Sequence, residues 1–339
     1  MKALIVWLGL AVGSLTAGRA IAQAPETKKV TLAVGGKSLL YYLPVTIAER
    51  KGYFKDEGLE VEIPDFAGGA KSLQALIGGS ADVVSGSYEH TISMQAKGQK
   101  VIAFVVQGNA PGIALAVRKD KAAAVKSGKD LAGFKIGVTA PGSSTNMFVN
   151  TLLAKDGLKP DAVSIVGVGP GAGAVAAMQK GELEAISNLD PVISQLEAAA
   201  HAVILFDTRT EKGNQEVYGG VYHAATLYTT EAFLRRNPNT VQALTNAMVR
   251  GLKWLARATP DDVLALVPPE YWGADKELYR TALKKNFGSY SKDGRFSMES
   301  AERVMKVLKA FDATVQHATI DLSRTFDDGF TAKANEKYH

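Results

Sequence analysis

Apolar runs and stretches of helical spacing alternate along the chain in an order that occurs twice. In the first copy they cover residues 31–35, 48–52, 59–63, 72–77 and 81–85. About 100 residues later, matching segments cover residues 135–139, 153–157, 162–166, 175–181 and 183–187. Short links between strands and helices predict a parallel-rich sheet in each copy, and so an α/β fold of two lobes. Two such lobes side by side place their strand ends around a shared crevice, where ligands bind.

Two further extended runs, residues 113–118 and 222–228, predict strands at which the chain crosses between the lobes. From residue 230 to the C-terminus the spacing is helical, with amphipathic stretches over 243–258 and 298–313. This tail has no strand of its own, so we expect it to pack on the first lobe. The expected organisation is a signal peptide over 1–24, a discontinuous first lobe over 25–115 and 225–339, and a second lobe over 116–224.

The N-terminus predicts export. Met1 and Lys2 precede an apolar run over residues 3–15, and small residues before position 25 fit a cleavage site. The alternative of a membrane anchor is disfavoured, because the run is shorter than the roughly 20 residues that span a bilayer. The sequence contains no cysteine, which excludes lipidation at an N-terminal cysteine, disulfides and thiolate metal sites. We therefore expect a periplasmic protein.

Charge and motifs argue against several other functions. The formal net charge is only +5 and the basic residues form no stripe, so no nucleic-acid partner is expected. The glycines of residues 167–173 approach a dinucleotide-binding pattern, but they follow a strand of the second lobe and suit a tight turn at the crevice rim. The histidines lack metal-ligand spacing, and no nucleophile elbow or phosphate-binding loop is present. We expect no catalytic residues, no metal and no cofactor.

Residues 42–61, with the sequence YLPVTIAERKGYFKDEGLEV, resemble a signature of the nitrate/sulfonate/taurine-type substrate-binding proteins of ABC importers. This group includes binders of thiamine-pyrimidine precursors. Shorter matches lie at residues 76–83, 130–138 and 190–193, and the resemblance covers about residues 30–260. It implies a periplasmic-binding-protein fold, with two α/β lobes joined by hinge strands, a ligand in the cleft between them, and delivery to a permease in the inner membrane.

The loops that follow the predicted strands supply the candidate ligand-binding residues. In the first lobe these are Tyr41, Tyr42, Phe66, Gly68, Ser87 and Tyr88. In the second lobe and the return crossing they are Ser143, Ser144, Thr145, Asn188, Asp190 and Tyr222. Strand ends meet at the crevice, so we expect these residues to line it.

The side chains of these loops limit the chemical class of the expected ligand. Ser143, Ser144 and Thr145 start a predicted helix, where hydroxyls, N–H groups and the helix dipole hold an oxyanion; simple capping of the helix is the alternative. For the four candidate tyrosines the alternative is half-buried packing. Asp190 either meets an amine of the ligand or caps the next helix. The loops carry no arginine for a bidentate clamp on a bare inorganic anion, so we expect an organic molecule with a flat or apolar body.

The expected function is that of a monomeric periplasmic protein that captures a small organic molecule and delivers it to an ABC permease. A sulfonate or an aromatic carboxylate is the first expectation for the ligand. The alternatives are a pyrimidine or other heterocyclic nutrient, a receptor that presents its ligand to a sensor kinase, and a relative of pyrimidine-synthesis enzymes. We do not expect an enzyme.

Overall fold

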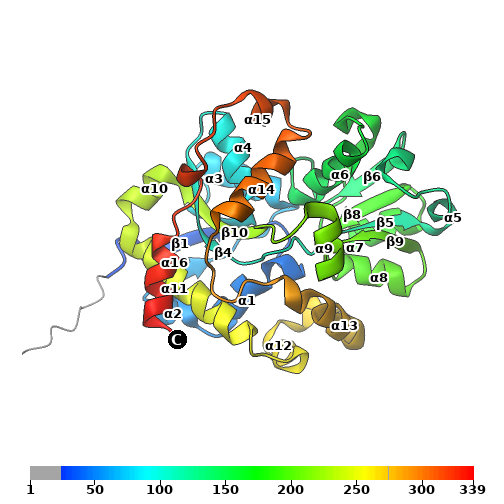
Figure 1. Ribbon diagram of the computed structural model, residues 1–339. Coiled ribbons are helices and arrows are strands. Elements are labelled where there is room, and N and C mark those ends of the chain that lie inside the picture. Colours follow the sequence, from blue (N-terminus) through cyan, green and yellow to red (C-terminus); the bar gives the residue numbers. More distant parts are fainter. Residues whose placement is uncertain (1–23, 274) are drawn as a thin grey trace, which may run out of the picture.

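The computed structural model describes residues 24–273 and 275–339, which form two α/β lobes (Figure 1). The predicted signal peptide, apart from its last residue, lies outside the described residues. The expected fold of two lobes with parallel-rich sheets is confirmed. No helix among the described residues is long and apolar enough to cross a membrane.

The first lobe is built on a five-stranded sheet in the order β2-β1-β3-β10-β4. Strand β1 pairs in parallel with β2 and β3, whereas β10 runs antiparallel between β3 and β4. All five residues of β3 are buried, as expected for a strand covered on both faces. The strands are β1 Lys29–Ala33, β2 Glu60–Glu62, β3 Val83–Ser87, β4 Val101–Val106 and β10 Ala225–Thr230.

The second lobe repeats this arrangement in the order β7-β6-β8-β5-β9. Here β6 pairs in parallel with β7 and β8, and β5 runs antiparallel between β8 and β9. Each sheet thus receives its antiparallel strand from a crossing of the chain, because β5 enters the second sheet and β10 returns to the first. The strands are β5 Ala114–Arg118, β6 Lys135–Val138, β7 Ser164–Gly167, β8 Ala185–Asn188 and β9 Ala202–Asp207.

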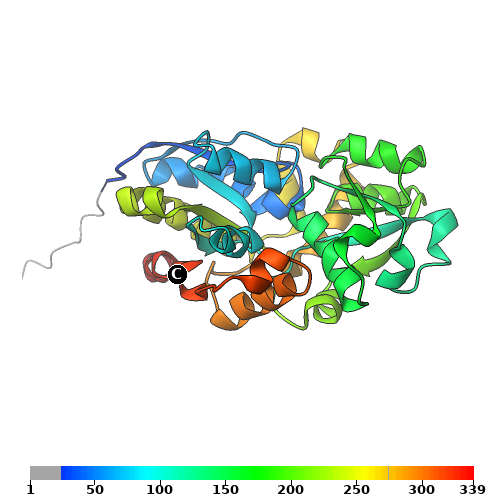
Figure 2. The same cartoon turned by 90° about the horizontal axis from the view of Figure 1, so that it is seen from above.

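Helices cover both sheets (Figures 1 and 2). Those inserted between the strands of the first lobe are α1 Leu43–Arg50, α2 Tyr53–Asp56, α3 Gly69–Ile77 and α4 Glu89–Ala96. Those of the second lobe are α5 Lys119–Ala122, α6 Ser144–Lys155, α7 Ala172–Gln179, α8 Val192–Ala198 and α9 Glu211–Tyr218.

The C-terminal tail is helical and packs mainly on the first lobe. Its helix α11 lies against α1 and α2, and α14 lies against α4, while α13 also reaches α8 of the second lobe. A separate apolar cluster that includes Leu43, Ile47, Val263 and Leu283 fastens α12 and α13 to α1. The tail helices are α10 Glu231–Arg236, α11 Pro238–Leu255, α12 Pro260–Leu266, α13 Lys276–Asn286, α14 Met298–Lys309, α15 Ala313–His317 and α16 Gly329–Lys337.

Candidate functional site

Loops of the two lobes touch each other across the crevice. Ser143, at the start of α6 in the second lobe, accepts a hydrogen bond from the backbone N–H of Ala70 in α3 of the first lobe, at 3.0 Å. The ring nitrogen Nε2 of His90, in α4, lies 3.2 Å from the carbonyl oxygen of Gly142. The structure therefore shows the lobes in a closed arrangement.

Glu89 is the centre of a buried polar cluster where α4 begins after β3. Glu89 is only 2% exposed. The hydroxyl of Ser87 donates to one carboxylate oxygen, at 2.5 Å, and the hydroxyl of Tyr222 donates to the other, at 2.7 Å. The ring of Tyr222 stacks on that of Tyr218, with 3.9 Å between ring centroids. Two predicted site residues, Ser87 and Tyr222, thus meet at an acid.

The electrostatics of this cluster favour a hydrogen-bond donor as its partner. Burial raises the pKa of Glu89, although the hydrogen bonds from Ser87 and Tyr222 act in the opposite direction. Burial, with the nearby negative charge of Glu89, also raises the pKa of Tyr41. The buried hydroxyl of Tyr41 has no hydrogen-bond partner among the described residues. A ligand group with N–H or O–H donors would satisfy both the carboxylate and this phenol.

Aromatic side chains extend the cluster toward the second lobe. The rings of Tyr41 and Tyr42 meet edge to face, with centroids 5.1 Å apart. His90 bonds through Nδ1 to the hydroxyl of Tyr228, at 2.9 Å. Burial lowers the pKa of His90 to about 4, so its ring is neutral at neutral pH. The first lobe therefore presents an aromatic wall with a single buried acid.

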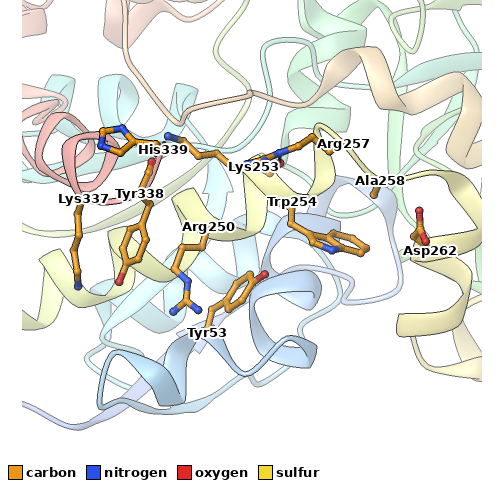
Figure 3. A pocket seen from close by; sticks show the side chains of 10 residues that line it. All are labelled: Tyr53, Arg250, Lys253, Trp254, Arg257, Ala258, Asp262, Lys337, Tyr338 and His339. Atoms are coloured by element: carbon orange, nitrogen blue, oxygen red, sulfur yellow. Dashed lines mark hydrogen bonds between the residues drawn. The ribbon is translucent and has the colours of Figure 1, made fainter.

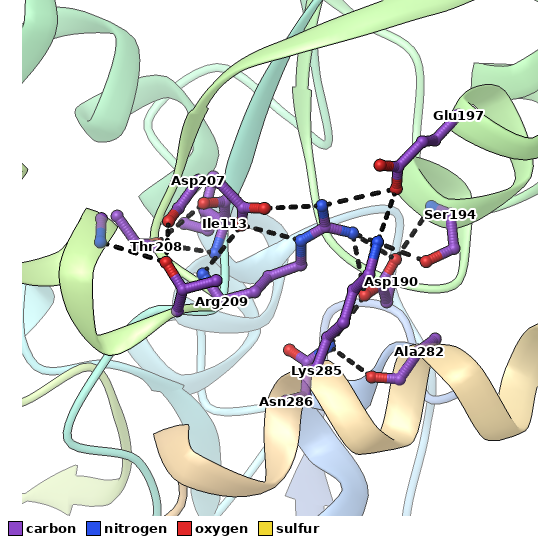
Figure 4. A network of polar contacts seen from close by, with 12 residues as sticks. Ile113, Asp190, Ser194, Glu197, Asp207, Thr208, Arg209, Ala282, Lys285 and Asn286 are labelled. Carbon is purple, nitrogen blue, oxygen red and sulfur yellow. Dashed lines mark hydrogen bonds and ion pairs between the residues drawn. The ribbon is translucent and has the colours of Figure 1, made fainter. Parts of the chain in front are cut away.

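Protein donors occupy the carboxylate of Asp190 (Figure 4). It accepts the N–H of Ser194 at the start of α8, at 2.9 Å, so capping is the correct one of its two predicted roles. Asn286 of α13 donates to it at 2.7 Å, and the Arg209 guanidinium lies 3.2 Å away. The side chains of Asp190 and Arg209 are 0% and 1% exposed.

Arg209 is a buried arginine that the sequence analysis did not single out. Its guanidinium also pairs with Asp207, at 2.7 Å, and with Glu197, at 3.7 Å. Burial by itself lowers the pKa of Arg209, but the hydrogen bond to Asp207 and the charges of Asp190 and Asp207 raise it above its ordinary value. The three carboxylates occupy this cation, so it does not offer a clamp for an anionic ligand.

The three hydroxyls at the start of α6 have different surroundings. Ser143 makes no capping bond within its own helix and bonds to Ala70 across the crevice instead. Thr145 is fully buried and bonds to the backbone and hydroxyl of Thr139, at 3.1 and 2.9 Å. Ser144 is half-buried and makes no side-chain hydrogen bond within the described part of the chain. Of the run predicted to hold an oxyanion, only Ser144 keeps a free hydroxyl there.

The polar groups of Tyr88 and Asn188 bond to other protein groups. The Tyr88 hydroxyl bonds to Thr325, at 2.6 Å, and its ring packs against Phe296 and Phe326 in the core of the first lobe. The prediction that Tyr88 lines the crevice is therefore wrong, because it lies between Ser87 and Glu89 and points to the opposite side. Asn188 is fully buried and its amide donates to the carbonyl of Gly169, at 3.2 Å.

Phe66 and Gly68 lie on the loop that leads into α3. Phe66 is half-buried, and Gly68 is buried beside the second lobe. A Cβ atom on Gly68 would lie 2.9 Å from the Cβ of Ala140, and one on Gly35 would lie 2.3 Å from the backbone of Gly68. Glycine at position 68 lets the loops of the two lobes approach each other closely, and glycine at position 35 lets two loops of the first lobe do so.

Glu89 and Tyr218 are not among the ligand-binding residues predicted from the sequence. Glu89 stands two positions after Ser87, in a loop already selected, so its place at a strand end was a readable signal. Tyr218 ends α9, four residues before the predicted crossing strand, and its stacking on Tyr222 places it beside the cluster.

A cavity of about 560 Å³ lies outside the crevice, where α11 and the C-terminal residues meet α2 (Figure 3). The Arg250 guanidinium lies over the ring of Tyr53, at 4.1 Å, and pairs with Asp56, at 2.7 Å. Lys337 pairs with Glu57, at 3.2 Å. Because protein groups occupy these cations, the cavity is a weaker candidate for a ligand site than the crevice.

The structure has two α/β lobes that face each other across a crevice, and comparison with known proteins identifies its family. A family model described as NMT1/THI5 like matches residues 40–262, and the chain belongs to this family. The solved structure of a protein from Bordetella bronchiseptica RB50 is 52% identical, with a TM-score of 0.90 over 93% of this chain and 99% of that one.

Other relatives include binding proteins and enzymes. The binding protein YtlA of Bacillus subtilis is 24% identical over 89% of this chain and 91% of its own length. The alkanesulfonate-binding protein SsuA of Xanthomonas axonopodis pv. citri, bound to MOPS, has a TM-score of 0.70 at 18% identity, covering 92% of this chain and 99% of its own. The 4-amino-5-hydroxymethyl-2-methylpyrimidine phosphate synthase of Schizosaccharomyces pombe is 30% identical, but over only 40% of this chain and 38% of its own. The predicted periplasmic-binding-protein fold is confirmed.

Proposed function

We propose that this protein is a periplasmic solute-binding protein that captures a small organic molecule between its lobes and delivers it to an ABC permease. The ligand in this proposal is a flat, nitrogen-containing ring compound that donates hydrogen bonds to Glu89. The single observation that carries the ligand class is the buried carboxylate of Glu89, held by Ser87 and Tyr222 and with no cation among its hydrogen-bond partners.

Two physical arguments support this ligand. An anion placed beside a buried carboxylate is repelled, whereas an N–H donor or a cation is attracted. The rings of Tyr41, Tyr218 and Tyr222 provide flat surfaces on which an aromatic heterocycle can stack. This inverts the order of the sequence-based expectation, which placed a sulfonate or aromatic carboxylate before a pyrimidine.

A thermal-shift screen of aminopyrimidines, other amino-heterocycles, sulfonates and aromatic carboxylates tests the proposal. A ligand at 100 times its dissociation constant should add about 2.7 kcal/mol to the free energy of unfolding. We expect the heterocycles to stabilise the protein. Stabilisation by sulfonates alone would overturn the ligand class.

Substitution of Glu89 sharpens the test. Glu89→Gln removes the negative charge but keeps the shape, and we expect it to weaken binding of the heterocycle at least tenfold, on the scale of a charged hydrogen bond. Parent affinity should rise with pH as Glu89 ionises, because the ionised form is the better acceptor, and the glutamine variant should lose this dependence. Equal binding and equal pH profiles for both proteins would show that Glu89 does not hold the ligand.

An organic sulfonate is the second candidate, favoured by the fold likeness to the alkanesulfonate-binding protein and by the free hydroxyl of Ser144 at the start of α6. If it is correct, Ser144→Ala should weaken binding and Glu89→Gln should not. Delivery to a sensor kinase instead of a permease remains an alternative for the same ligand, and the genes beside this one would separate the two. The partial match to pyrimidine phosphate synthases leaves an enzyme as a further alternative, to be tested by product formation.

A further inference from the structure

A second groove runs between the lobes, lined by α3 and α4 on one side and by the start of α6 on the other. Its volume is about 620 Å³. In Figure 1, α3 and α4 lie in the first lobe and α6 lies in the second, with α15 above α4. Ala70, His90 and Gly142 border both this groove and the crevice, but Glu89, which holds the ligand in the function proposed above, does not line the groove.

In the first lobe, one face of α3 and one face of α4 line the groove. In α3 the groove is lined by Ala70, Leu73, Gln74 and Ile77, and in α4 by His90, Ser93, Met94 and Lys97. Both sets follow the i, i+3, i+4, i+7 spacing that places side chains on one face of a helix. Ile77 is 42% exposed, so its apolar side chain is available to an occupant.

The second lobe and the tail complete the walls. Pro141, Met147 and Asn150 come from the second lobe, and Phe311 comes from the segment between α14 and α15. The hydroxyl of Ser93, in a residue that is 6% exposed, has no hydrogen-bond partner among the described residues. A buried hydroxyl without a partner in an apolar groove marks a place where an occupant can form a hydrogen bond.

We propose that this groove is a second binding site, for a small uncharged molecule with an aliphatic or aromatic body and one hydrogen-bonding group for Ser93. The volume falls within the range of about 300–1,000 Å³ typical of small-molecule sites. Of the two charged lining residues, Asp312 is engaged in capping α15 and Lys97 lies at the exposed end of α4. The groove therefore offers mainly apolar surface to its occupant, with the Ser93 hydroxyl and the amide side chains of Gln74, Asn146 and Asn150, and no buried charge.

The position between lobes gives the site a role beyond binding. Ile77 and Met94 belong to the first lobe and Met147 to the second, so only the closed protein offers both walls together. A molecule that touches both lobes binds the closed state more tightly and shifts the equilibrium toward it. By thermodynamic reciprocity, an occupant of this groove and a ligand in the crevice then strengthen each other's binding.

The neutral fluorophore N-phenyl-1-naphthylamine is a suitable probe, because it has an aromatic body and one N–H. We expect one saturable site in the full chain, with a smaller radius of gyration in the complex. Ile77→Asp and Met147→Asp should each weaken binding about tenfold or more, since each brings a charge into an apolar contact. The matched control is Val203→Asp, an equally exposed apolar residue at 41% that lies outside the groove. Circular dichroism verifies that the variants fold.

Three outcomes would overturn the inference. Absence of saturable binding would exclude a small-molecule site and leave the groove to a protein partner. Weakening by Ile77→Asp but not by Met147→Asp would confine the probe to the first lobe and remove the coupling to closure. Equal loss in the Val203→Asp control would indicate non-specific binding. None of these results depends on the crevice ligand, so the proposed function can stand or fall separately.

Discussion

Two buried acids, Glu89 and Asp190, have opposite surroundings, and the difference decides their roles. Neutral hydroxyls hold Glu89, and its carboxylate lies close enough to the phenol of Tyr41 to help burial raise the pKa of that phenol. The carboxylate of Asp190 pairs with Arg209 and accepts hydrogen bonds from Asn286 and from a backbone N–H of α8. A carboxylate whose charge is already neutralised gains little from a ligand, whereas one held only by neutral hydroxyls gains much. We therefore assign recognition to Glu89 and structure to Asp190.

The role of Arg209 leads to a stability prediction. Arg209→Leu leaves Asp190 and Asp207 without their cation, and Asp190 is fully buried, so we expect a loss of about 3–5 kcal/mol in the free energy of unfolding. The control is Arg118→Leu, whose partner Asp120 is 60% exposed, with an expected loss below about 1 kcal/mol. Urea titration measures both. Similar losses for the two variants would contradict a structural role for the buried pair.

At the level of elements, the starts of α3 and α6 form the contact that holds the crevice shut. The N–H of Ala70 in the first turn of α3 finds its acceptor in Ser143 of the other lobe. Such an N–H has no partner within its own helix, so a cap supplied from across the crevice satisfies it only when the lobes are closed. The same hydrogen bond therefore caps α3 and holds the two lobes together.

The loop before α3 is placed by a close approach to Gly35 within the first lobe, which Gly35→Ala should prevent. The new Cβ would lie 2.3 Å from the backbone of Gly68 and Gly69, so the loop before α3 must shift. We expect a loss of about 1–3 kcal/mol, on the scale of overpacking, and weaker ligand binding in the crevice. Gly171→Ala is the control, because its Cβ meets nothing within 4 Å. Thermal unfolding and calorimetry together test this, and unchanged values for Gly35→Ala would refute the steric argument.

On the scale of the whole molecule, the two sheets have the same topology. In each sheet the antiparallel strand is the one that the chain forms after it crosses from the other lobe. β5 and β10 occupy equivalent places in their sheets. The crossings join two rigid sheets, which suits rotation of one lobe against the other. The proposed division into a first lobe over 25–115 and 225–339 and a second over 116–224 makes residues 113–118 and 222–228 the hinge.

Small-angle scattering tests this division. We expect the ligand-free protein to be more open than the structure described here, and the identified crevice ligand to compact it until its scattering matches the closed arrangement. Far-UV circular dichroism should stay constant, because closure moves the lobes as rigid bodies. An identical radius of gyration with and without ligand at saturation would contradict a hinge.

Local pattern alone determined the two α/β lobes and their duplicated strand order. Alternating apolar runs and helical stretches are read from neighbouring residues, and a parallel arrangement follows from the short connections. The same reasoning selected Tyr41, Ser87 and Tyr222 because strand ends and crossings border the crevice. These features depend on spacing along the chain, which the sequence displays directly.

Only the tertiary structure decided which groups at those strand ends remain free. Tyr88 is adjacent to Ser87 and Glu89, yet its ring lies in the lobe core, because the chain at this point turns successive side chains to opposite sides. Asp190 bonds to Arg209, which lies 19 positions away in the sequence. Ser143 bonds to the N–H of Ala70, which lies 73 positions away. The availability of a polar group depends on partners brought near by folding, and such partners leave no local signal in the sequence.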